Sequence, residues 1–500
     1  MTSWIDRSAL AQRDALLRRE VSATELLEAT LERATRIAGT VNPIALRLDQ
    51  RAMEAADKAD RVLRRGRPGP LCGLPVSIKD SQWLKGVRCA NGSQSLVNFI
   101  PNATCRSVDR LEQAGAVIFG KTTCPEFCLS GTNNSPLYGA TRNPWDLSKT
   151  PGGSSGGAAA SIAAGVGSFS LGGDGGGSIR IPAAFCGVVG FKPTHGVVPR
   201  GPGFGTWDAL IAYGPMARSV ADARLMFDAV ATHDKLMPAL RRGKDAPLRI
   251  VVSEDLGFAP VDASIRECFR QVALQLADAE ITCIESNPGL TSSVVTWASL
   301  ATHDMWLHKR DQEFNHPDFR HIVGRYAREF IHFGSRFTDQ DIADSHSHQR
   351  EIFNAYSAMF DRSHSDILIT PALGCEAFDG SLTHPVAIEQ KEITYPWLDW
   401  AGLLYDANLT GMPSCSIPMG FGESGLPVGL QIMGRPGHDL EVLDAAEAIE
   451  KIIGWQHQIA PDFVARADGG QTDSAQVGYI PDLESVSPPG ELSEPQFPAN

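Results

Sequence analysis

The chain has 500 residues, of which 43% are hydrophobic and 21% charged, close to the average for globular proteins. This composition excludes a wholly disordered chain and argues against a membrane protein. The formal net charge is −13. Because nucleic-acid binding relies on clustered positive charge, this balance argues against nucleic acid as a partner.

The cysteine pattern and the N-terminus indicate the compartment. Ten cysteines form no C-x-x-C pair, which favours reduced thiols over a disulfide scaffold or a zinc ribbon. The first 20 residues are interrupted by charge and lack the apolar stretch of a secretion signal. The longest weakly polar run, residues 158–173, is shorter than the ~18 residues that span a bilayer. We therefore expect a cytoplasmic protein without a membrane segment.

The patterns along the chain predict a single α/β domain over residues 1–465. Two amphipathic helices open it, Ser8–Arg19 and Ser22–Ile37, the second with a capping box of Ser22 and Glu25. Apolar runs bounded by Gly and Pro then alternate with helical patterns; these runs are LPVSIK, AVIFGK, GSFSLGG, RIVVS, ITCIES, DILITP, CSIPMG and PVGLQIM. Such alternation predicts a central twisted mixed sheet covered by helices on both faces.

Within that domain we expect three parts and, after it, a tail. The N-terminal helices occupy residues 1–65, a catalytic core 66–240 and a helical pocket wall 290–365. The segment 466–500 is an acidic, proline-rich tail; from Ala467 it contains six acidic residues, five prolines and neither Lys nor Arg. Such a segment buries too little apolar surface to offset its ordering entropy.

Two glycine- and serine-rich clusters between residues 150 and 182 carry the strongest functional signal. A phosphate-binding loop would need a following Gly-Lys-Ser/Thr, which is absent. A nucleophile elbow at Ser155 would need a preceding buried strand, where the chain has a proline-containing loop. The third hypothesis makes Ser178 the nucleophile, because three preceding glycines let backbone N–H groups converge as an oxyanion hole.

A serine nucleophile needs a base, and two residue types are candidates. His195 lies in a turn-like segment with no evident carboxylate to orient it. Lys79 ends a strand-like run, and strand alternation turns the neighbouring Asp80 to the other face. A buried lysine without an ion partner favours the neutral amine, which is a competent base.

In this order and spacing, GLPVSIKD, TPGGSSGG and GGDGGGSIRIPAAFCGVVGFKPTHG resemble the amidase signature family of serine hydrolases. The resemblance extends from about residue 5 to 460, through GKTTCPEFCLSGTNNSPLYGATRNPWD and GLPVGLQIMGRP. It implies an amidase signature fold and a Ser-cisSer-Lys triad formed by Ser178, Ser154 and Lys79, with the peptide bond before Ser154 held cis.

The resemblance also implies roles for the neighbouring residues. The N–H groups of the segment 175–178 would form the oxyanion hole, Asp174 and Arg180 would brace that loop, and Ser155 would support the triad. The oxyanion residues are Gly175, Gly176, Gly177 and Ser178. The segment formed by Cys128, Leu129 and Ser130 would line the acyl pocket, and its small side chains suggest room for a bulky group. The family often has Thr at position 173 and Thr or Ile at position 175, so the glycines found here predict a more flexible loop.

The function expected is hydrolysis of a small-molecule amide through an acyl-enzyme, with no metal and no organic cofactor. One alternative is the same mechanism on a carbamate, aryl amide or ester. Another is the ammonia-releasing component of a glutamine-using, tRNA-dependent amidotransferase, which would need a partner subunit. A homodimer stays open. A metal site would draw on a histidine-dense stretch, but H-E-x-x-H is absent and its spacings do not repeat. Those residues are His303, His308, His316, His321, His332, His346, His348 and His364.

Overall fold

A computed structural model describes residues 4–237, 248–310, 319–393, 399–456 and 460. By its internal contacts the chain separates into a large unit, Met1–Gly469, and a short one, Gly470–Asn500. The expected tail over 466–500 lies outside the described residues.

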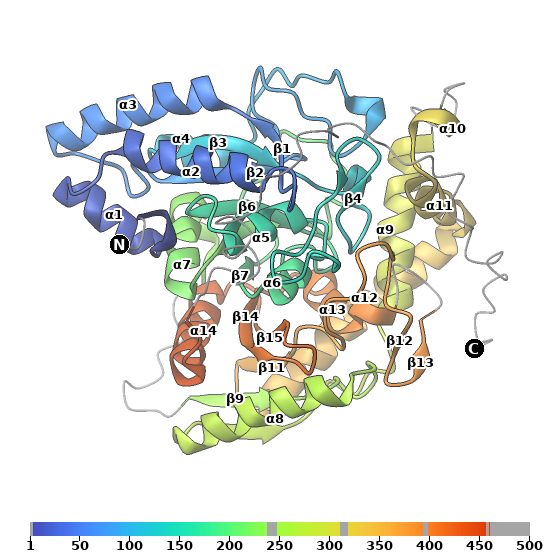
Figure 1. The fold of residues 1–500 in the computed structure, drawn as a ribbon. Coiled ribbons are helices and arrows are strands. Elements are labelled where there is room, and N and C mark those ends of the chain that lie inside the picture. The colour runs from blue at the N-terminus through green and yellow to red at the C-terminus, as the bar shows by residue number, and fades with distance from the viewer. Residues whose placement is uncertain (1–3, 238–247, 311–318, 394–398, 457–459, 461–500) are drawn as a thin grey trace. The chain divides into compact units, whose positions relative to one another are not determined.

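An 11-stranded sheet forms the centre of the large unit (Figure 1). The strand order is β1-β3-β2-β6-β8-β7-β14-β15-β11-β9-β10. Their bounds are β1 (Ile44–Arg47), β2 (Pro75–Lys79), β3 (Val117–Thr122), β6 (Phe169–Asp174), β7 (Val189–Lys192), β8 (Ala212–Ala217), β9 (Arg249–Val252), β10 (Thr282–Glu285), β11 (Ile367–Pro371), β14 (Ser414–Phe421) and β15 (Pro427–Gly434). Two two-stranded sheets join β4 (Asn134–Ser135) to β5 (Gly139–Ala140) and β12 (Ala387–Ile388) to β13 (Lys391–Glu392).

The sheet is mixed, and its parallel part positions the site. β2 runs parallel to β3 on one side and to β6 on the other, with Ile78 opposite Leu171. The carboxyl ends of β2 and β6 therefore meet at one edge of the sheet, which places Lys79 near the segment that follows Asp174. Beyond β6 the sheet continues through antiparallel pairs of the strands β8, β7, β14, β15 and β11. At its far end β9 runs parallel to β11, and the edge strand β10 runs parallel to β9.

Helices cover both faces of this sheet, as the alternating pattern predicted. On β15, a Cβ at Gly429 would lie 2.5 Å from Ala184 of α6 (Arg180–Cys186), and one at Gly434 would lie 2.5 Å from Val442 of α14 (Asp439–Ile453). Residues five apart in a strand point to opposite faces, so α6 and α14 lie on opposite sides.

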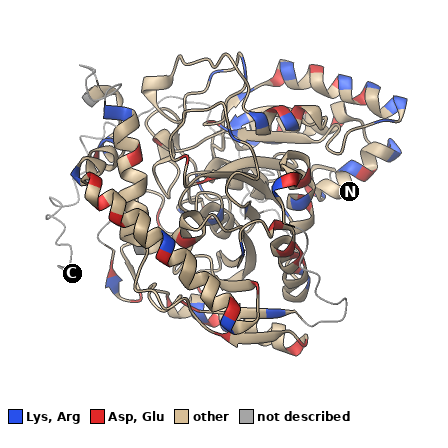
Figure 2. Cartoon of the chain, turned by 180° about the vertical axis from the view of Figure 1, so that it is seen from behind, with Lys and Arg blue, Asp and Glu red and all other residues tan. Residues whose placement is uncertain are grey.

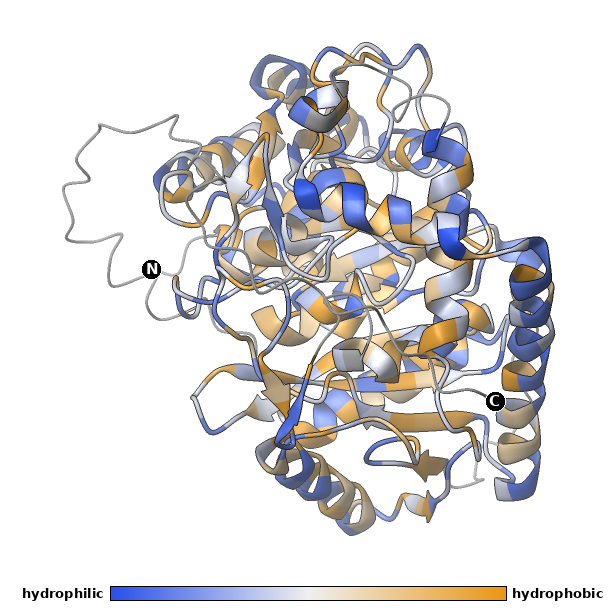
Figure 3. Cartoon of the chain, turned by 90° about the vertical axis from the view of Figure 1, so that its right-hand side faces the viewer, coloured by the Kyte–Doolittle hydropathy of each residue, from blue (hydrophilic) through white to orange (hydrophobic). Residues whose placement is uncertain are grey.

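The remaining α-helices surround this core (Figure 1). They are α1 (Ala9–Arg18), α2 (Ala23–Ile37), α3 (Asp49–Arg65), α4 (Arg106–Gln113), α5 (Gly156–Ala163), α7 (Val220–Val230), α8 (Ala263–Asp278), α9 (Val294–Lys309), α10 (Phe319–Ile322), α11 (Arg325–Phe333), α12 (Asp339–Ser363) and α13 (Gly402–Leu409). Charged residues gather on outer helices such as α3 and α12 (Figure 2), while the strands are predominantly apolar (Figure 3). The hydrophobic effect accounts for this division.

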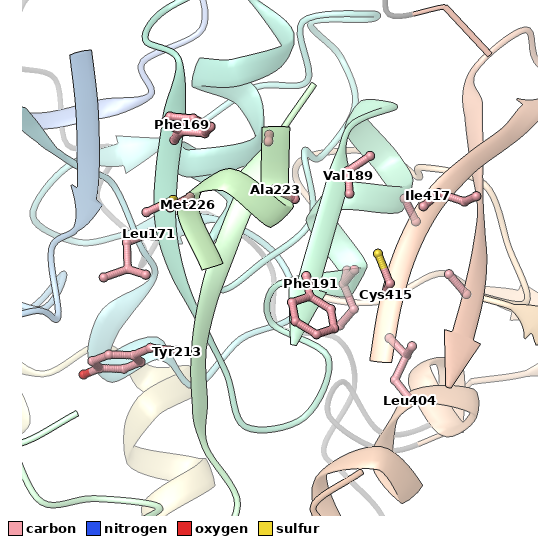
Figure 4. Packing of buried hydrophobic residues seen from close by; sticks show 14 of the residues in the cluster. Phe169, Leu171, Val189, Phe191, Tyr213, Ala223, Met226, Leu404, Cys415 and Ile417 are labelled. Carbon is pink, nitrogen blue, oxygen red and sulfur yellow. The ribbon is translucent and has the colours of Figure 1, made fainter. Parts of the chain in front are cut away.

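The core lies between the sheet and its helices. Figure 4 shows Phe169 and Leu171 of β6, Phe191 of β7 and Cys415 of β14, all buried. The ring of Phe191 meets that of Phe227 of α7 edge-on, with centroids 5.1 Å apart, a favoured aromatic geometry. This packing fixes the strand ends that hold the site.

The predicted elements are largely confirmed. Ser8 caps α1, and Ser22 and Glu25 form the expected capping box of α2. Each of the eight predicted runs forms a strand. Three strands of the main sheet, β1, β7 and β8, were not predicted. The interior of β8 holds Gly214 and Pro215, which break the usual strand pattern.

Candidate active site

Lys79 is buried at the end of β2 and faces a hydroxyl. Its side chain is only 1% exposed, and its Nζ lies 2.7 Å from the Ser154 Oγ and 3.5 Å from the carbonyl oxygen of Gly173. Asp80 faces away, as strand alternation predicted, and its carboxylate pairs with Lys121 at 3.1 Å and accepts the Tyr138 hydroxyl at 2.8 Å. The amine is therefore held next to a hydroxyl and a carbonyl, while the adjacent carboxylate is engaged elsewhere.

Ser154 and Ser155 lie in the loop that leads into α5. The Gly153–Ser154 peptide bond is cis, as the resemblance implied. A Cβ at Gly153 would lie 2.4 Å from the carbonyl oxygen of Thr132, so this close approach requires glycine. The Ser155 Oγ donates to the carbonyl of Gly173 and accepts its N–H, both at 3.2 Å. Ser155 thus ties the first serine-rich cluster to the end of β6.

The segment after β6 is a tightly packed turn. Gly177 has a positive φ of +98°, and its N–H donates to the Asp174 carboxylate at 2.8 Å. A Cβ at Gly175 would lie 2.3 Å from Trp207, and one at Gly176 would lie 2.4 Å from Trp297. Two indole rings therefore occupy the space that larger side chains at these two positions would fill.

Asp174 and Arg180, the residues expected to brace this loop, form a buried ion pair. The two side chains are inaccessible to solvent and meet at 2.9 Å. Burial would raise the pKa of Asp174, but the guanidinium of Arg180 outweighs it and holds the pKa well below its usual range. Arg180 also donates to Asn408 Oδ1 at 2.6 Å, to Gln431 Oε1 at 2.7 Å and to the carbonyl of Leu404 at 2.9 Å.

Two cavities meet at Ser178, which is 8% exposed. The smaller has a volume of about 30 Å³ and the larger about 700 Å³. The smaller is lined by the predicted Cys128, Leu129 and Ser130, and by Gly131, Gly176, Ser178, Ile181, Trp207, Trp297, Trp400, Ala401 and Tyr405. The room expected there for a bulky group is not found, because large aromatic side chains fill it.

Cys128 faces both cavities from a left-handed backbone conformation with φ of +62°. Its Sγ lies 3.2 Å from Asn91 Oδ1. Burial opposes ionisation of this thiol, but hydrogen bonds from Cys124, Ser81 and Ser154 favour the thiolate, and the pKa of Cys128 falls to about 6.

The rival residues do not join the serine cluster. His195 is exposed on the rim of the larger cavity, and its backbone N–H donates to Gly411. In the histidine-dense stretch, His303 and His348 bond separately to Gly334 and Thr296. His316 lies outside the described residues. Within the described part of the chain, no group of three or more His, Cys, Asp or Glu could hold a metal ion.

Sequence reasoning missed the residues that complete the site from a distance. Asn408 of α13 donates to both the carbonyl and the carboxylate of Asp174 at 3.0 Å. The indole N–H of Trp297 on α9 donates to the carbonyl of Gly175 at 2.8 Å, so the predicted helical wall does reach the site. The sequence around Asn408 gives no signal for its role.

Comparisons with known proteins identify the family and the fold. The family model Amidase matches residues 25–443. The chain is 32% identical to a glutamyl-tRNA(Gln) amidotransferase component of Moorella thermoacetica, covering 90% of this chain and 97% of the relative. It is 30% identical to an acylamidase of Rhodococcus erythropolis, covering 93% and 98%. A solved amidase structure superimposes with a TM-score of 0.80 at 30% identity, covering 89% and 99%.

A search of the described helices finds none that is both long and apolar enough to cross a membrane. The family model covers most of the chain, and the fold agrees with that of the matched amidase structure. The chain therefore belongs to the amidase signature family of enzymes that act on C–N bonds.

Proposed function

We propose that the protein hydrolyses linear carboxylic amides with Ser178 as nucleophile, Ser154 as proton relay and Lys79 as general base. The observation that carries this proposal is the position of the buried Lys79 amine, 2.7 Å from the Ser154 hydroxyl. Ser154 in turn lines the same cavity as Ser178. A neutral amine there has a lone pair for the Ser154 proton and an N–H for the carbonyl of Gly173.

The proposed reaction has two halves. In the first, the Ser178 Oγ bonds to the amide carbon while its proton passes to Ser154 and the Ser154 proton passes to Lys79. Lys79 returns a proton through Ser154 to the leaving nitrogen, the C–N bond breaks, and ammonia or an amine departs. In the second, water attacks the acyl-enzyme ester with the same relay and releases the carboxylic acid.

The oxyanion of each tetrahedral intermediate would be held by backbone N–H groups of the loop 175–178. The N–H of Gly177 already donates to Asp174. We therefore assign the stabilising role to Gly175, Gly176 and Ser178, and give Gly177 the role of anchoring the loop. This differs from the four-donor hole that the resemblance implied.

The amidotransferase relatives favour a second candidate, the ammonia-releasing component of a glutamine-using amidotransferase. That function requires ammonia release from free glutamine and a stable partner subunit. Carbamates, aryl amides and esters would use the same residues. We assign the protein to the cytoplasm, since its ten cysteines are all free in the structure, and leave a homodimer open.

A fluorophosphonate probe tests the nucleophile. We expect its mass on the peptide that contains Ser178 and no labelling of Ser178→Ala. Ser161→Ala is the matched control, because Ser161 is a buried serine of α5 that donates to Val166, and it should label normally. Labelling confined to Ser155 would contradict the assignment.

A substrate panel tests the reaction and the base. Primary amides, anilides, urethanes, nitrophenyl esters and glutamine separate the amidase from its alternatives. Lys79→Arg should be inactive, because a guanidinium stays protonated and does not act as a base. Near-normal turnover in Lys79→Arg would overturn the role of Lys79.

A further inference from the structure

The two cavities at Ser178 differ in which catalytic hydroxyl they expose. Ser178 lines both, whereas Ser154 lines the larger one. In the proposed reaction the relay hydroxyl must return a proton to the leaving nitrogen, so this nitrogen must face Ser154. The amine part of the substrate therefore occupies the larger cavity, and the acyl part occupies the smaller, aromatic one.

The size of the cavities supports the same assignment. The larger cavity has a volume of about 700 Å³, within the range of sites that bind whole organic ligands. The smaller has about 30 Å³, enough for a group of the size of one or two methyls. Recognition of the substrate must then rest largely on its amine part.

The wall of the larger cavity is positively charged, although the protein as a whole carries −13. Its lining contains four cationic side chains, Arg106, Arg110, Arg200 and Lys235, and one carboxylate, Asp208. An excess of one sign of charge in a cavity attracts ligands of the opposite sign.

Among the described residues, the side-chain hydrogen-bond partners of two of these cations, Arg110 and Lys235, are neutral groups and not carboxylates. Arg110 donates to the carbonyl of Val230 at 2.7 Å and to the Thr232 hydroxyl at 3.1 Å. Lys235 donates to the carbonyl of Gly196 at 3.0 Å. The carboxylate of Asp208 pairs with Arg200 from a position where its side chain is 72% exposed. The Asp208 carboxylate is therefore largely solvated, which weakens its attraction for Arg200.

Arg200 lies where it can reach a substrate. Its guanidinium carbon is 5.9 Å from the centre of the Tyr213 ring, and Tyr213 packs on Gly173, next to the catalytic loop. The charge on this wall also acts on His195. Although its side chain reaches solvent at the cavity rim, partial burial, followed by the charges of Lys192 and Arg200, lowers the pKa of His195 to about 4.

We propose that the amine part of the substrate carries an anionic group, a carboxylate or a similar oxyanion, which the larger cavity binds through Arg200 and its cationic neighbours. This inference rests on the proposed amidase function and names the substrate class. A guanidinium and a carboxylate form charge-assisted hydrogen bonds, which a neutral substrate lacks.

The test compares three acetamides of benzylamines that differ at the para position. The substituents are a carboxylate, a methyl group and a dimethylaminomethyl cation, and the methylene insulates the reacting amide from their electronic effects. The acetyl group suits the smaller cavity. We expect kcat/KM for the carboxylate to exceed that for the methyl compound by about tenfold or more, with the cation slowest. Because the attraction is ionic, this preference should shrink between about 20 and 500 mM NaCl.

Two variants that remove charges of opposite sign from the cavity wall extend the test. Arg200→Gln should lower the carboxylate-to-methyl ratio of kcat/KM by about tenfold, and Asp208→Asn should raise it. Arg61→Gln, which removes an exposed arginine of α3, is the matched control and should leave the ratio unchanged. Thermal midpoints check that each variant folds; if Arg200→Gln does not, Asp208→Asn and the salt dependence of the unmodified protein decide.

The outcomes separate the two proposals. Equal rates for the three acetamides, or a ratio unchanged in Arg200→Gln and Asp208→Asn, would overturn the anionic substrate while leaving the amidase function intact. Failure to hydrolyse any member of this series or of the wider amide panel would overturn the amidase function itself.

Discussion

Replacement of Asp174 by Asn should destabilise the protein and slow the reaction together. The Asp174 carboxylate accepts the N–H of Gly177 at 2.8 Å, that of Ile179 at 3.1 Å, the Arg180 Nε at 2.9 Å and Nη2 at 3.0 Å, and Asn408 at 3.0 Å. An asparagine keeps one acceptor oxygen and turns an NH₂ group toward these donors. The buried guanidinium of Arg180 then loses its counter-charge.

The size of the effect follows from that burial. Breaking a buried ion pair from one side costs about 3–5 kcal/mol, because the remaining charge stays buried without compensation. Loss of the anchor on Gly177 should also displace the adjacent N–H groups of the proposed oxyanion hole. Removal of one such donor slows turnover by about 10²–10³. We therefore expect a loss of roughly 3–5 kcal/mol in the free energy of unfolding and a fall of about a hundredfold in kcat.

Urea unfolding and turnover of a primary amide measure the two quantities. The matched control is Asp444→Asn, which breaks a pair with Arg224 in which the aspartate is 71% exposed and should cost less than about 1 kcal/mol. In Asp174→Asn/Arg180→Gln, removal of the orphaned charge should restore part of the stability but not kcat. A loss of stability in Asp174→Asn no larger than in the control would refute the argument that Arg180 depends on this carboxylate.

Three further predictions follow from the packing and the ionisation of the site. Gly176→Ala should lower kcat sharply, because its Cβ would lie 2.4 Å from Trp297; turnover equal to that of the unmodified protein would contradict the close packing. Iodoacetamide should alkylate Cys128, with a rate that rises between about pH 5 and 7 and then levels, since its pKa is about 6; peptide mass spectrometry measures this, and a rise continuing to about pH 9 would contradict it. Burial raises the pKa of Glu450 from 4.5 to about 7, so its stabilising contribution is complete below pH 4.5 and is lost as the pH rises through 7. Glu450→Gln should flatten thermal midpoints over this range, removing a pH-dependent contribution of roughly 3 kcal/mol, and an unchanged pH profile would contradict this origin.

Local patterns were sufficient for the elements that depend on local chemistry. The Ser22 and Glu25 capping box, and strands such as β2, follow from hydrogen bonds and burial within a few residues. β8 was missed because its place between β6 and β7 is set by pairing across the sheet, with Pro215 opposite Leu171, and not by its own propensity.

The same division applies to the site. The serine clusters stand out because their composition is unusual in the sequence itself, whereas the role of Lys79 was implied by the family resemblance. Asn408 and Trp297 reach the loop after β6 from α13 and α9, and only the assembled fold brings them there. Their residue types are ordinary for a packed helix, so no sequence pattern distinguishes them from core residues. The aromatic filling of the smaller cavity was missed for the same reason.

Because Gly175 and Trp207 are in close contact, substitutions at these two positions depend on each other. A threonine at position 175 would collide with the indole, whose ring lies 2.3 Å from the site of a Cβ. Truncation of Trp207 alone would leave a void that costs about 3–5 kcal/mol. Neither change is favourable by itself, so an evolutionary path between glycine and a larger residue at 175 passes through a paired substitution. Directed evolution that samples single substitutions should therefore leave both positions unchanged, whereas libraries that vary 175 and 207 together should yield active combinations.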